Sequence, residues 1–437
     1  MHRPTTAITI TVSIIILLVG LSRAAVCSSL FLPGFSSSWH YMYHSRYLPS
    51  RTLWSRTRLL APGAARTMYL LSEREVQQAL NWQDCLDATR QAFVSITQKT
   101  AAVPTRLGLP YPNNPNHPLQ SSSNNDNNNN NDDNTSTSPA DWTLFKPAAY
   151  YAGTDGDSDI AMGLKIVSIR AANPSLDLPL VPATILLLDP VTGMVDATLG
   201  GTYLTVARTS AGPAVAVQTF CPHVQHLVLF GAGAQAECHV QLMQVALQRT
   251  IPRITIINRS LSRAEALRTK LLQEQGQQQE GNEQQQQEIQ VVLLSDQEAV
   301  HAALSTADVV SATTNTATPL WQDGSILKPN CLITGIGSYT PDMQEVPESA
   351  VNRCHVIIDT PEAREVGDLK HLPSHHPITL AGHAFENPSE IGTSTSSTTP
   401  IDCIFYKAVG TAIHDVLTAR AVVERAKQMG IGQEVDM

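Results

Sequence analysis

A short apolar run that passes directly into a glycine-rich turn and then into a helical pattern is the feature of this chain that most constrains its fold. The turn has the sequence GAGAQA at residues 231–236, within the segment from His226 to Met243. Gly231 permits a tight turn, Gly233 lets backbone N–H groups approach a pyrophosphate, and Ala236 lets the helix pack close to its strand. Because a strand precedes the turn and a helix follows it, the context of a dinucleotide-binding turn is present. We therefore predict that the phosphates of a dinucleotide contact Gly231, Gly233, Ala234 and Gln235.

The second predicted strand indicates which dinucleotide is bound. It runs from Arg253 to Ile257 and is followed by Asn258, Arg259 and Ser260, with no carboxylate at the strand end. An NAD enzyme usually places an acidic residue there to hold the ribose 2′-hydroxyl. A guanidinium and a hydroxyl instead suit a 2′-phosphate. The sequence therefore favours NADP(H), with NAD(H) as the alternative, and predicts that these three residues after the strand bind the cofactor.

Strands and helices alternate beyond this point. Apolar runs at 291–294, 308–310 and 331–335 are separated by helix-like segments at 262–272 and 296–304. Such alternation predicts an α/β fold with a Rossmann-type, doubly wound parallel sheet. We assign residues 219–370 to this NADP-binding domain and interpret the Gln-rich tract at 273–287 as an insertion that extends one of its helices.

A different pattern precedes the nucleotide domain, in residues 68–218. It predicts a helix capped by Ser72, a second helix from Trp82 to Ile96, strands at 143–151, 162–169, 184–189 and 194–199, and a helix at 204–218. The Asn-rich tract at 113–140 has almost nothing to bury and is a surface insertion. A polar loop and a closing helix, at about 408–429, are predicted in residues 371–437. That helix could pack back on the first elements, which would make a discontinuous α+β domain.

The charge balance excludes one class of partner. The chain has 29 Lys and Arg against 38 Asp and Glu, and the seven charged residues before Glu73 are all arginines, so the remainder is more acidic still. Nucleic-acid binding relies on basic surfaces, and we expect no nucleic-acid partner.

The seven cysteines form no C-x-x-C pair, and the histidines at 371, 375 and 376 have no neighbouring cysteine or acidic cluster. No metal site is predicted.

Residues 1–67 have the character of a targeting leader. The first 72 residues contain no Asp, Glu or Lys, with an apolar run from Ala7 to Leu21 and an Arg-rich tract from Arg23 to Arg66. The run is short for a membrane span but suits a signal peptide, and the tract behind it is typical of a transit peptide. We expect import into an organelle, with a plastid favoured slightly over a mitochondrion and a retained signal anchor still open. We expect no stable membrane span in the mature protein.

Several separated motifs, taken together, resemble the ornithine cyclodeaminase and mu-crystallin family from about Met68 to Gly430, the insertions excepted. They are MGLKIV at 162–167, LTVARTSA at 204–211, the turn at 231–236 with NRS at 258–260, ADVVSATT at 307–314, GIGSYTPDMQE at 335–345 and FYKAVGTA at 405–412. The resemblance implies a homodimer joined through the first, substrate-binding domain. It also implies that Thr209, Thr313 and Thr314 line the cofactor site.

The same resemblance implies that Arg106, Lys165 and Arg208 line the substrate pocket and hold a carboxylate beside the nicotinamide. A guanidinium gives bidentate, charge-assisted hydrogen bonds to a carboxylate and would fix which face of a C=N bond meets the hydride. Lys165 could also donate or position a proton, so Lys165 and Arg208 are the predicted catalytic residues. Both lie in apolar segments, where a buried charge needs a partner.

The chain departs from one branch of the family at Ser338. Ornithine cyclodeaminases carry an aspartate there that assists deamination, whereas mu-crystallin-type reductases have a small residue. A serine hydroxyl near neutral pH is a poor general base. We therefore expect Ser338 to line the substrate site of an NAD(P)H-dependent ketimine reductase. Its substrate would be a cyclic ketimine carboxylate, such as piperideine-2-carboxylate or pyrroline-2-carboxylate, reduced to pipecolate or proline.

Three other functions stay open. One is cyclodeamination of ornithine to proline and ammonia, which Ser338 and Arg259 disfavour. Another is an oxidoreductase similar to alanine dehydrogenase, which would use the same pocket. The last, from a different class, is an NADPH-dependent protein that binds a small ligand with little turnover. Because the chain has all three residues that the resemblance places in the pocket, Arg106, Lys165 and Arg208, catalysis is favoured over ligand binding alone.

Overall fold

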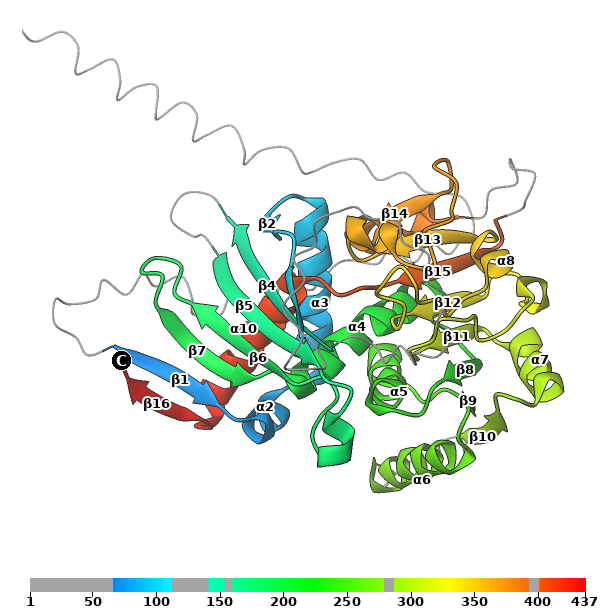
Figure 1. Ribbon diagram of the computed structural model, residues 1–437, viewed down its shortest axis with the longest axis horizontal. Helices are drawn as coiled ribbons and strands as arrows, with labels where there is room; N and C mark the ends of the chain where they lie inside the picture. The colour runs from blue at the N-terminus through cyan, green and yellow to red at the C-terminus, as the bar shows by residue number, and fades with distance from the viewer. Residues whose placement is uncertain (1–65, 112–140, 154–158, 279–286, 393–400) are drawn as a thin grey trace, which may run out of the picture. The chain divides into compact units, whose positions relative to one another are not determined.

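A computed structural model describes residues 66–111, 141–153, 159–278, 287–392 and 401–437. The predicted leader up to residue 65, and most of each predicted polar insertion, lie outside these ranges. All described residues belong to one compact unit. They form two eight-stranded sheets, which Figure 1 shows with helix α4 (Thr202–Phe220) between them.

The first sheet is almost entirely antiparallel. Only β1 and β7 run parallel, and β3 pairs with the edge of β4. The strand order is β16 (Gln433–Asp436), β1 (Thr67–Leu71), β7 (Val195–Gly200), β6 (Ala183–Leu188), β5 (Asp159–Ile169), β4 (Asp141–Ala152) and β2 (Ala101–Ala102), with β3 at Leu107–Tyr111. The four strands predicted before residue 200 are thus confirmed, with slightly different ends.

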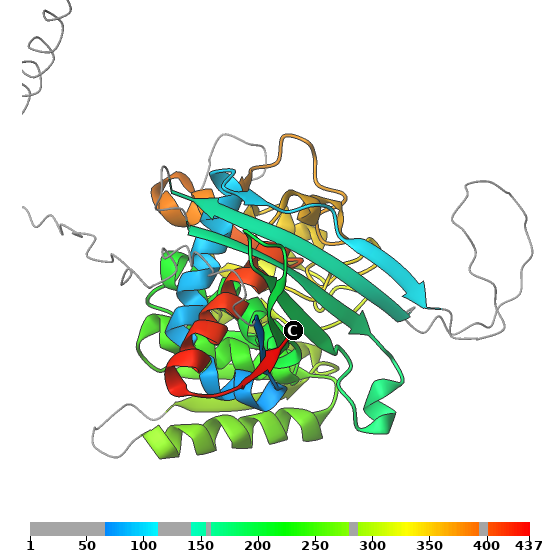
Figure 2. The same cartoon turned by 90° about the vertical axis from the view of Figure 1, so that its left-hand side faces the viewer.

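Helices cover one face of this sheet. They are α2 (Glu73–Ala79), α3 (Trp82–Thr97) and α10 (Ala412–Met429), and Figure 2 shows α3 and α10 side by side against the long strands. Ser72 caps α2 as predicted, because its hydroxyl accepts from Glu75 N while the Glu75 carboxylate accepts from Ser72 N. The closing helix begins at Ala412 and not at residue 408, and it packs on β4, β5 and β6 of the first sheet, which lie far earlier in the chain.

The second sheet is fully parallel. Its order is β10 (Glu288–Leu293), β9 (Arg253–Asn258), β8 (His226–Phe230), β11 (Val309–Ala312), β12 (Leu332–Gly335), β15 (Cys403–Lys407), β13 (Cys354–Ile358) and β14 (Ile378–Leu380). Alternate residues of β8 face two different cores: Leu227 packs with α5 (Ala234–Leu247) and α6 (Leu261–Gln278), and Val228 packs with α7 (Gln297–Thr306) and α8 (Glu348–Val351). Helices therefore cover both faces, and the predicted doubly wound parallel sheet is confirmed.

The end of the second sheet differs from the prediction. Strands β14 and β15 lie in residues 371–437, where a polar loop and one helix were expected, and they extend the parallel sheet beyond residue 370. β15 inserts between β12 and β13, so strands out of sequence order become neighbours. Strand β15 was not predicted because it has only five residues and follows a polar tract. So short a segment does not show by itself the alternation of apolar and polar residues that marks a strand.

Among the described residues, no helix combines the length and the apolar character needed to cross a bilayer. Nor do the described histidines, cysteines and acidic residues gather in any group of three that could hold a metal ion.

Candidate functional site

The glycine turn after β8 leaves room for a phosphate. Gly231 has φ +113°, and a Cβ there would lie 2.6 Å from Thr313 Oγ1. Gly233 is the N-cap of α5, has no side-chain cap, and a Cβ on it would meet nothing within 4 Å. The first N–H groups of α5 therefore have no side-chain acceptor at the cap, and these features fit the pyrophosphate of a dinucleotide.

The turn lies where the order of the second sheet reverses. From β8 the chain adds β9 and β10 on one side and then β11 and β12 on the other. Ligands of open parallel sheets bind at such a switch point, outside the carboxyl ends of the strands. Thr313, at the end of β11, donates its hydroxyl to Phe230 O at 2.8 Å and so joins the two strands that flank the switch point.

The other predicted cofactor residues lie around this point. The Thr314 hydroxyl and N–H donate to Glu345 Oε1, at 2.9 and 2.7 Å. Ser210 of α4 donates to Gln235 Oε1 at 3.1 Å, which places its half-buried neighbour Thr209 close to the start of α5. Helix α4 thus approaches the turn with the residues that directly follow Arg208.

The predicted ribose-binding residues follow β9. Asn258 donates from Nδ2 to Ser260 O at 2.9 Å, which fixes the turn between β9 and α6. Arg259 is exposed and forms no ion pair among the described residues. Its guanidinium is therefore available to a ligand at this strand end.

A second group of predicted residues gathers about one buried carboxylate. Lys165 Nζ lies 2.6 Å from Asp415 Oδ1, Arg208 Nε lies 2.8 Å from the same oxygen, and Lys146 Nζ lies 3.5 Å from Oδ2. None of the four residues is more than 6% exposed. We call Lys146, Lys165, Arg208 and Asp415 the cationic cluster. Three cationic side chains meet one acid there, so the cluster can accept a further anion.

Burial and these neighbours change the pKa of each group. Burial alone would raise the pKa of Asp415, but Arg208, Lys165 and Lys146 outweigh it and hold that pKa below its ordinary value. Burial lowers the pKa of Lys146 to about 8, against the opposing effect of Asp415. Burial and then Arg208 lower the pKa of Lys165 well below its ordinary value. Both lysines can therefore lose a proton far more readily than a lysine in water.

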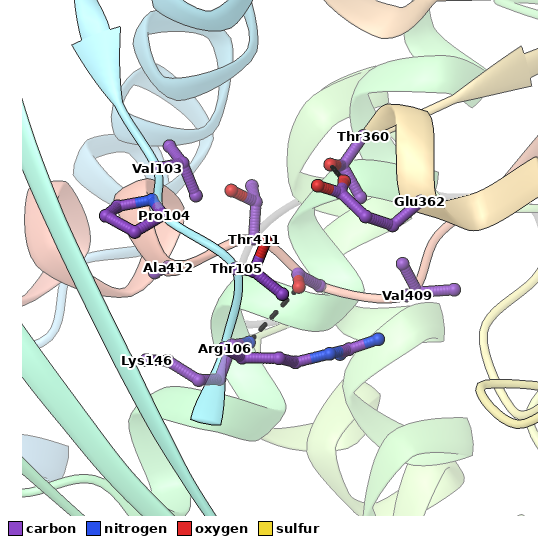
Figure 3. Close-up of a pocket in the computed structure, with 11 residues that line it drawn as sticks. Val103, Pro104, Thr105, Arg106, Lys146, Thr360, Glu362, Val409, Thr411 and Ala412 are labelled. Carbon is purple, nitrogen blue, oxygen red and sulfur yellow. Dashed lines mark hydrogen bonds between the residues drawn. The ribbon is translucent and has the colours of Figure 1, made fainter. Parts of the chain in front are cut away.

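A pocket that is open to solvent lies on one side of the cluster. Figure 3 shows its wall, which consists of residues 103–106 and Lys146 from the first domain and residues 360, 362 and 409–412 from the ends of β13 and β15. Arg106 and Lys146 reach the pocket directly, and Lys146 donates to Gly410 O at 3.1 Å. Lys165 and Arg208 are connected to it through Asp415. The arrangement can hold a small carboxylate at the carboxyl edge of the parallel sheet.

Gly410 brings Arg208 close to the pocket. Its φ is +81°, and a Cβ at this position would lie 2.7 Å from Arg208 Nη1. Only glycine combines this backbone conformation with room for the guanidinium. Arg208 Nε approaches Asp415 as an ion pair without the geometry of a hydrogen bond, so this donor remains unused.

Ser338 lies apart from this pocket. It is fully buried, its hydroxyl donates to Met343 O at 2.7 Å, and its N–H donates to Glu345 Oε2 at 3.2 Å. Ser338 is not among the residues that line the pocket. The structure thus brings Arg106, Lys165 and Arg208 to one place and puts Ser338 on the end of a different strand, β12.

Two members of the cationic cluster, Lys146 and Asp415, were not predicted from the sequence. Lys146 is a lysine within an apolar strand, the same signal that marked Lys165, and the two are register partners in β4 and β5. Asp415 carried no comparable signal, because its helix also bears charges on its open face. Its role depends on a contact between residues 250 positions apart.

Residues 152–430 match the model of the Ornithine cyclodeaminase/mu-crystallin family. An uncharacterized cyclodeaminase of Dictyostelium discoideum is 26% identical over 389 residues, which are 85% of this chain and 100% of that protein. The Delta(1)-pyrroline-2-carboxylate reductase of Bacillus cereus is 28% identical over 282 residues, 63% of this chain and 81% of the reductase.

The same fold is present in a solved structure, that of the Thermococcus litoralis Delta(1)-pyrroline-2-carboxylate reductase in complex with NADH and L-proline. The TM-score is 0.65 at 21% identity, over 84% of this chain and 100% of that one. The family match extends over more than half of the sequence and confirms the resemblance carried by the motifs. The chain belongs to the ornithine cyclodeaminase/mu-crystallin family.

Proposed function

We propose that the protein reduces a cyclic ketimine carboxylate, such as piperideine-2-carboxylate or pyrroline-2-carboxylate, to the cyclic amino acid with NADPH. The observation that carries this proposal is the cationic cluster beside a small pocket at the edge of a dinucleotide-binding sheet. Similarity to pyrroline-2-carboxylate reductases supports it.

The substrate carboxylate would lie against Lys146 and Arg106. Both line the pocket, and Lys165 and Arg208 add positive charge behind them. Charge-assisted hydrogen bonds in a buried site are strong and directional, so they would orient the C=N carbon. NADPH, when bound at the Gly231 turn, supplies the hydride. Lys165, whose pKa is well below the ordinary value, is suited to donating or positioning a proton.

The surroundings of Ser338 support reduction over cyclodeamination. Its hydroxyl donates to Met343 O and it does not line the pocket, so it is not placed to take a proton from ornithine. No carboxylate stands at this position.

Arg259 and Ser260 support NADP(H) as the cofactor in preference to NAD(H). The guanidinium is exposed without an ion pair among the described residues, and no acidic residue follows β9 directly. A 2′-phosphate would find a charge partner there, whereas a 2′-hydroxyl would lack its usual acceptor.

We also propose a homodimer joined through the open face of the first sheet. In β5, Lys165 and its alternate neighbours face the helices, so Leu164 and Ile166 face away from them, beside Leu186 of β6. Leu107 and Leu109 of β3, whose register partners Phe145 and Thr143 lie on the same side as Ile166, add exposed apolar surface at 60% and 49% exposure. An apolar face of this kind marks an interaction surface, and a second copy of the chain would cover it.

For localisation we propose that residues 1–67 direct the protein to an organelle, the plastid before the mitochondrion. The acid-free, Arg-rich composition behind an apolar run supports this. Expressing a fluorescent protein fused to residues 1–67 tests it, since retention in the cytosol would contradict the proposal.

An enzyme assay tests the function itself. The full chain is mixed with NADPH and piperideine-2-carboxylate or pyrroline-2-carboxylate, and nicotinamide absorbance is followed, with ornithine plus NAD in parallel. Turnover of a ketimine is the expected result. Release of proline and ammonia from ornithine would identify a cyclodeaminase, and binding of NADPH without any turnover would identify a ligand-binding protein.

A further inference from the structure

Thr411 presents a polar group on the pocket wall that no described residue of the protein hydrogen-bonds. It lines the pocket and is 3% exposed, yet its hydroxyl has no hydrogen-bond partner among the described residues. It is the N-cap of α10 but makes no capping hydrogen bond. A buried hydroxyl without a partner is costly, so its position on a pocket wall points to a ligand group that completes its hydrogen bonding.

Glu362 presents a carboxylate on the same wall. It is exposed, and Thr360 donates its hydroxyl to Oε2. Within the described part of the chain Oε1 accepts no hydrogen bond and Glu362 forms no ion pair. Figure 3 shows Thr360 and Glu362 across the pocket from Lys146, with Thr411 between the two sides.

Asp359 fixes these two groups relative to each other. Its carboxylate, at the end of β13, accepts from Val409 N at 3.1 Å and from Gly410 N at 2.7 Å, at the end of β15. Lys146 donates to the carbonyl of the same Gly410, one residue before Thr411. Lys146 of β4 and the two acceptors that follow β13 and β15 therefore line one pocket. A cation and acceptors around one pocket suit a molecule that carries both a carboxylate and a nitrogen.

From this geometry we infer that Glu362 and Thr411 form the site that recognises the N–H of the substrate, opposite the cations that bind its carboxylate. The inference rests on the proposed function and refines it, because it limits the substrate to compounds with a protonated ring nitrogen beside the carboxylate. The Glu362 carboxylate accepts from this N–H and stabilises the positive charge. A protonated iminium is a better hydride acceptor than a neutral imine, so the same contact favours reduction.

Ligand binding tests the site without depending on turnover. L-pipecolate and tetrahydropyran-2-carboxylate differ in having N–H or oxygen in the ring, and calorimetry on the full chain with NADP⁺ measures both. The full chain is expected to prefer L-pipecolate by about ten- to a hundredfold, the range of a hydrogen bond to a charged group. Glu362→Gln is expected to remove most of that preference while leaving the affinity for the oxygen analogue unchanged.

Two further variants complete the test: Glu365→Gln is the control, and Thr411→Val tests the second proposed acceptor. Glu365→Gln changes an exposed carboxylate of the same short helix that does not line the pocket, and the preference should stay as in the full chain. Thr411→Val should weaken L-pipecolate binding by roughly three- to tenfold. Because the Thr411 hydroxyl has no hydrogen-bond partner among the described residues, the melting temperature should not fall.

The outcomes separate this inference from the proposed function. If the full chain binds both ligands equally, or if Glu362→Gln keeps the full preference, the nitrogen site is overturned and the ketimine function stands. If neither ligand binds, and neither L-proline nor tetrahydrofuran-2-carboxylate binds in its place, the substrate class is wrong and the nitrogen site falls with it.

Discussion

Arg208 tests whether the positive charge behind the pocket supports carboxylate binding. Arg208→Ala should raise the KM for the ketimine and lower kcat/KM by about 2–3 kcal/mol, because a buried positive charge behind the bound carboxylate is lost. Steady-state kinetics measure the change. Arg425→Ala is the control, since Arg425 pairs with Asp84 at the surface and both side chains are more than 40% exposed. Unchanged kinetics in Arg208→Ala with an unchanged melting temperature would remove Arg208 from the site.

Lys146 should make carboxylate binding depend on pH. Its pKa is lowered to about 8 by burial, and only the protonated amine attracts an anion. Binding should therefore be strongest below that pH and should weaken as the pH rises through about 8, while Arg106 and Arg208 stay charged. Pyrrole-2-carboxylate is a suitable ligand because its ring nitrogen does not titrate in this range, and calorimetry with NADPH measures its Kd.

The conservative variant makes this prediction specific. Lys146→Arg keeps the charge well above this range, so the loss of affinity near pH 8 should disappear. A dissociation constant in the unmodified protein that does not change between about pH 7 and pH 9 would contradict the role given to Lys146.

At the scale of single residues, the sequence revealed the charges but not their partners. Lys165 and Arg208 stood out because each interrupts an apolar segment, and the structure buries both. Ser338 was expected in the substrate site, but the structure places its hydroxyl against Met343 O. Which group meets a side chain is decided by elements distant in the chain, and no local pattern records that.

At the scale of elements, the geometry of the turn after β8 predicts that NADPH binding requires glycine at position 231. Gly231→Ala should abolish tight NADPH binding, because its Cβ would lie 2.6 Å from Thr313 Oγ1 in a backbone with φ +113°. Gly193→Ala is the matched control, because Gly193 has φ +72° but nothing within 4 Å of its Cβ. Both variants should lose about 1 kcal/mol or more of stability, and only the first should lose NADPH binding, measured by fluorescence. Equal NADPH affinity in the two variants would contradict the assignment.

The residues that follow β9 lead to a second prediction, on the preference for NADPH over NADH. Arg259→Ala should lower kcat/KM for NADPH by about tenfold or more and leave the value for NADH nearly unchanged, because only the 2′-phosphate loses a charged partner. Arg268→Ala is the control, on the helix that follows this turn, where Arg268 pairs with Glu265 at the surface. An equal loss with both cofactors would show that Arg259 does not discriminate between them.

At the scale of the whole molecule, the open face of the first sheet predicts the oligomeric state. The protein should elute as a dimer, and a Leu164→Glu, Leu186→Glu double variant should elute as a monomer, because two charges on the apolar face oppose its burial. Size-exclusion chromatography with light scattering measures both. Leu261→Glu, at a residue 48% exposed at the start of α6, should remain dimeric. A monomeric unmodified protein would contradict the proposal.

The sequence by itself determined the dinucleotide turn, the parallel α/β domain and most of the strands and helices before it. Each of these follows from a local pattern: a glycine spacing, an alternation, or a helical period within one segment. The tertiary structure alone decided that Asp415 joins Lys146, Lys165 and Arg208, that β15 inserts between β12 and β13, and that Glu362 and Thr411 share a pocket wall. These contacts join residues from separate elements, up to 269 positions apart in the cluster, as with Lys146 and Asp415. Their energies depend on burial and distance, which arise only when the two sheets pack about α4.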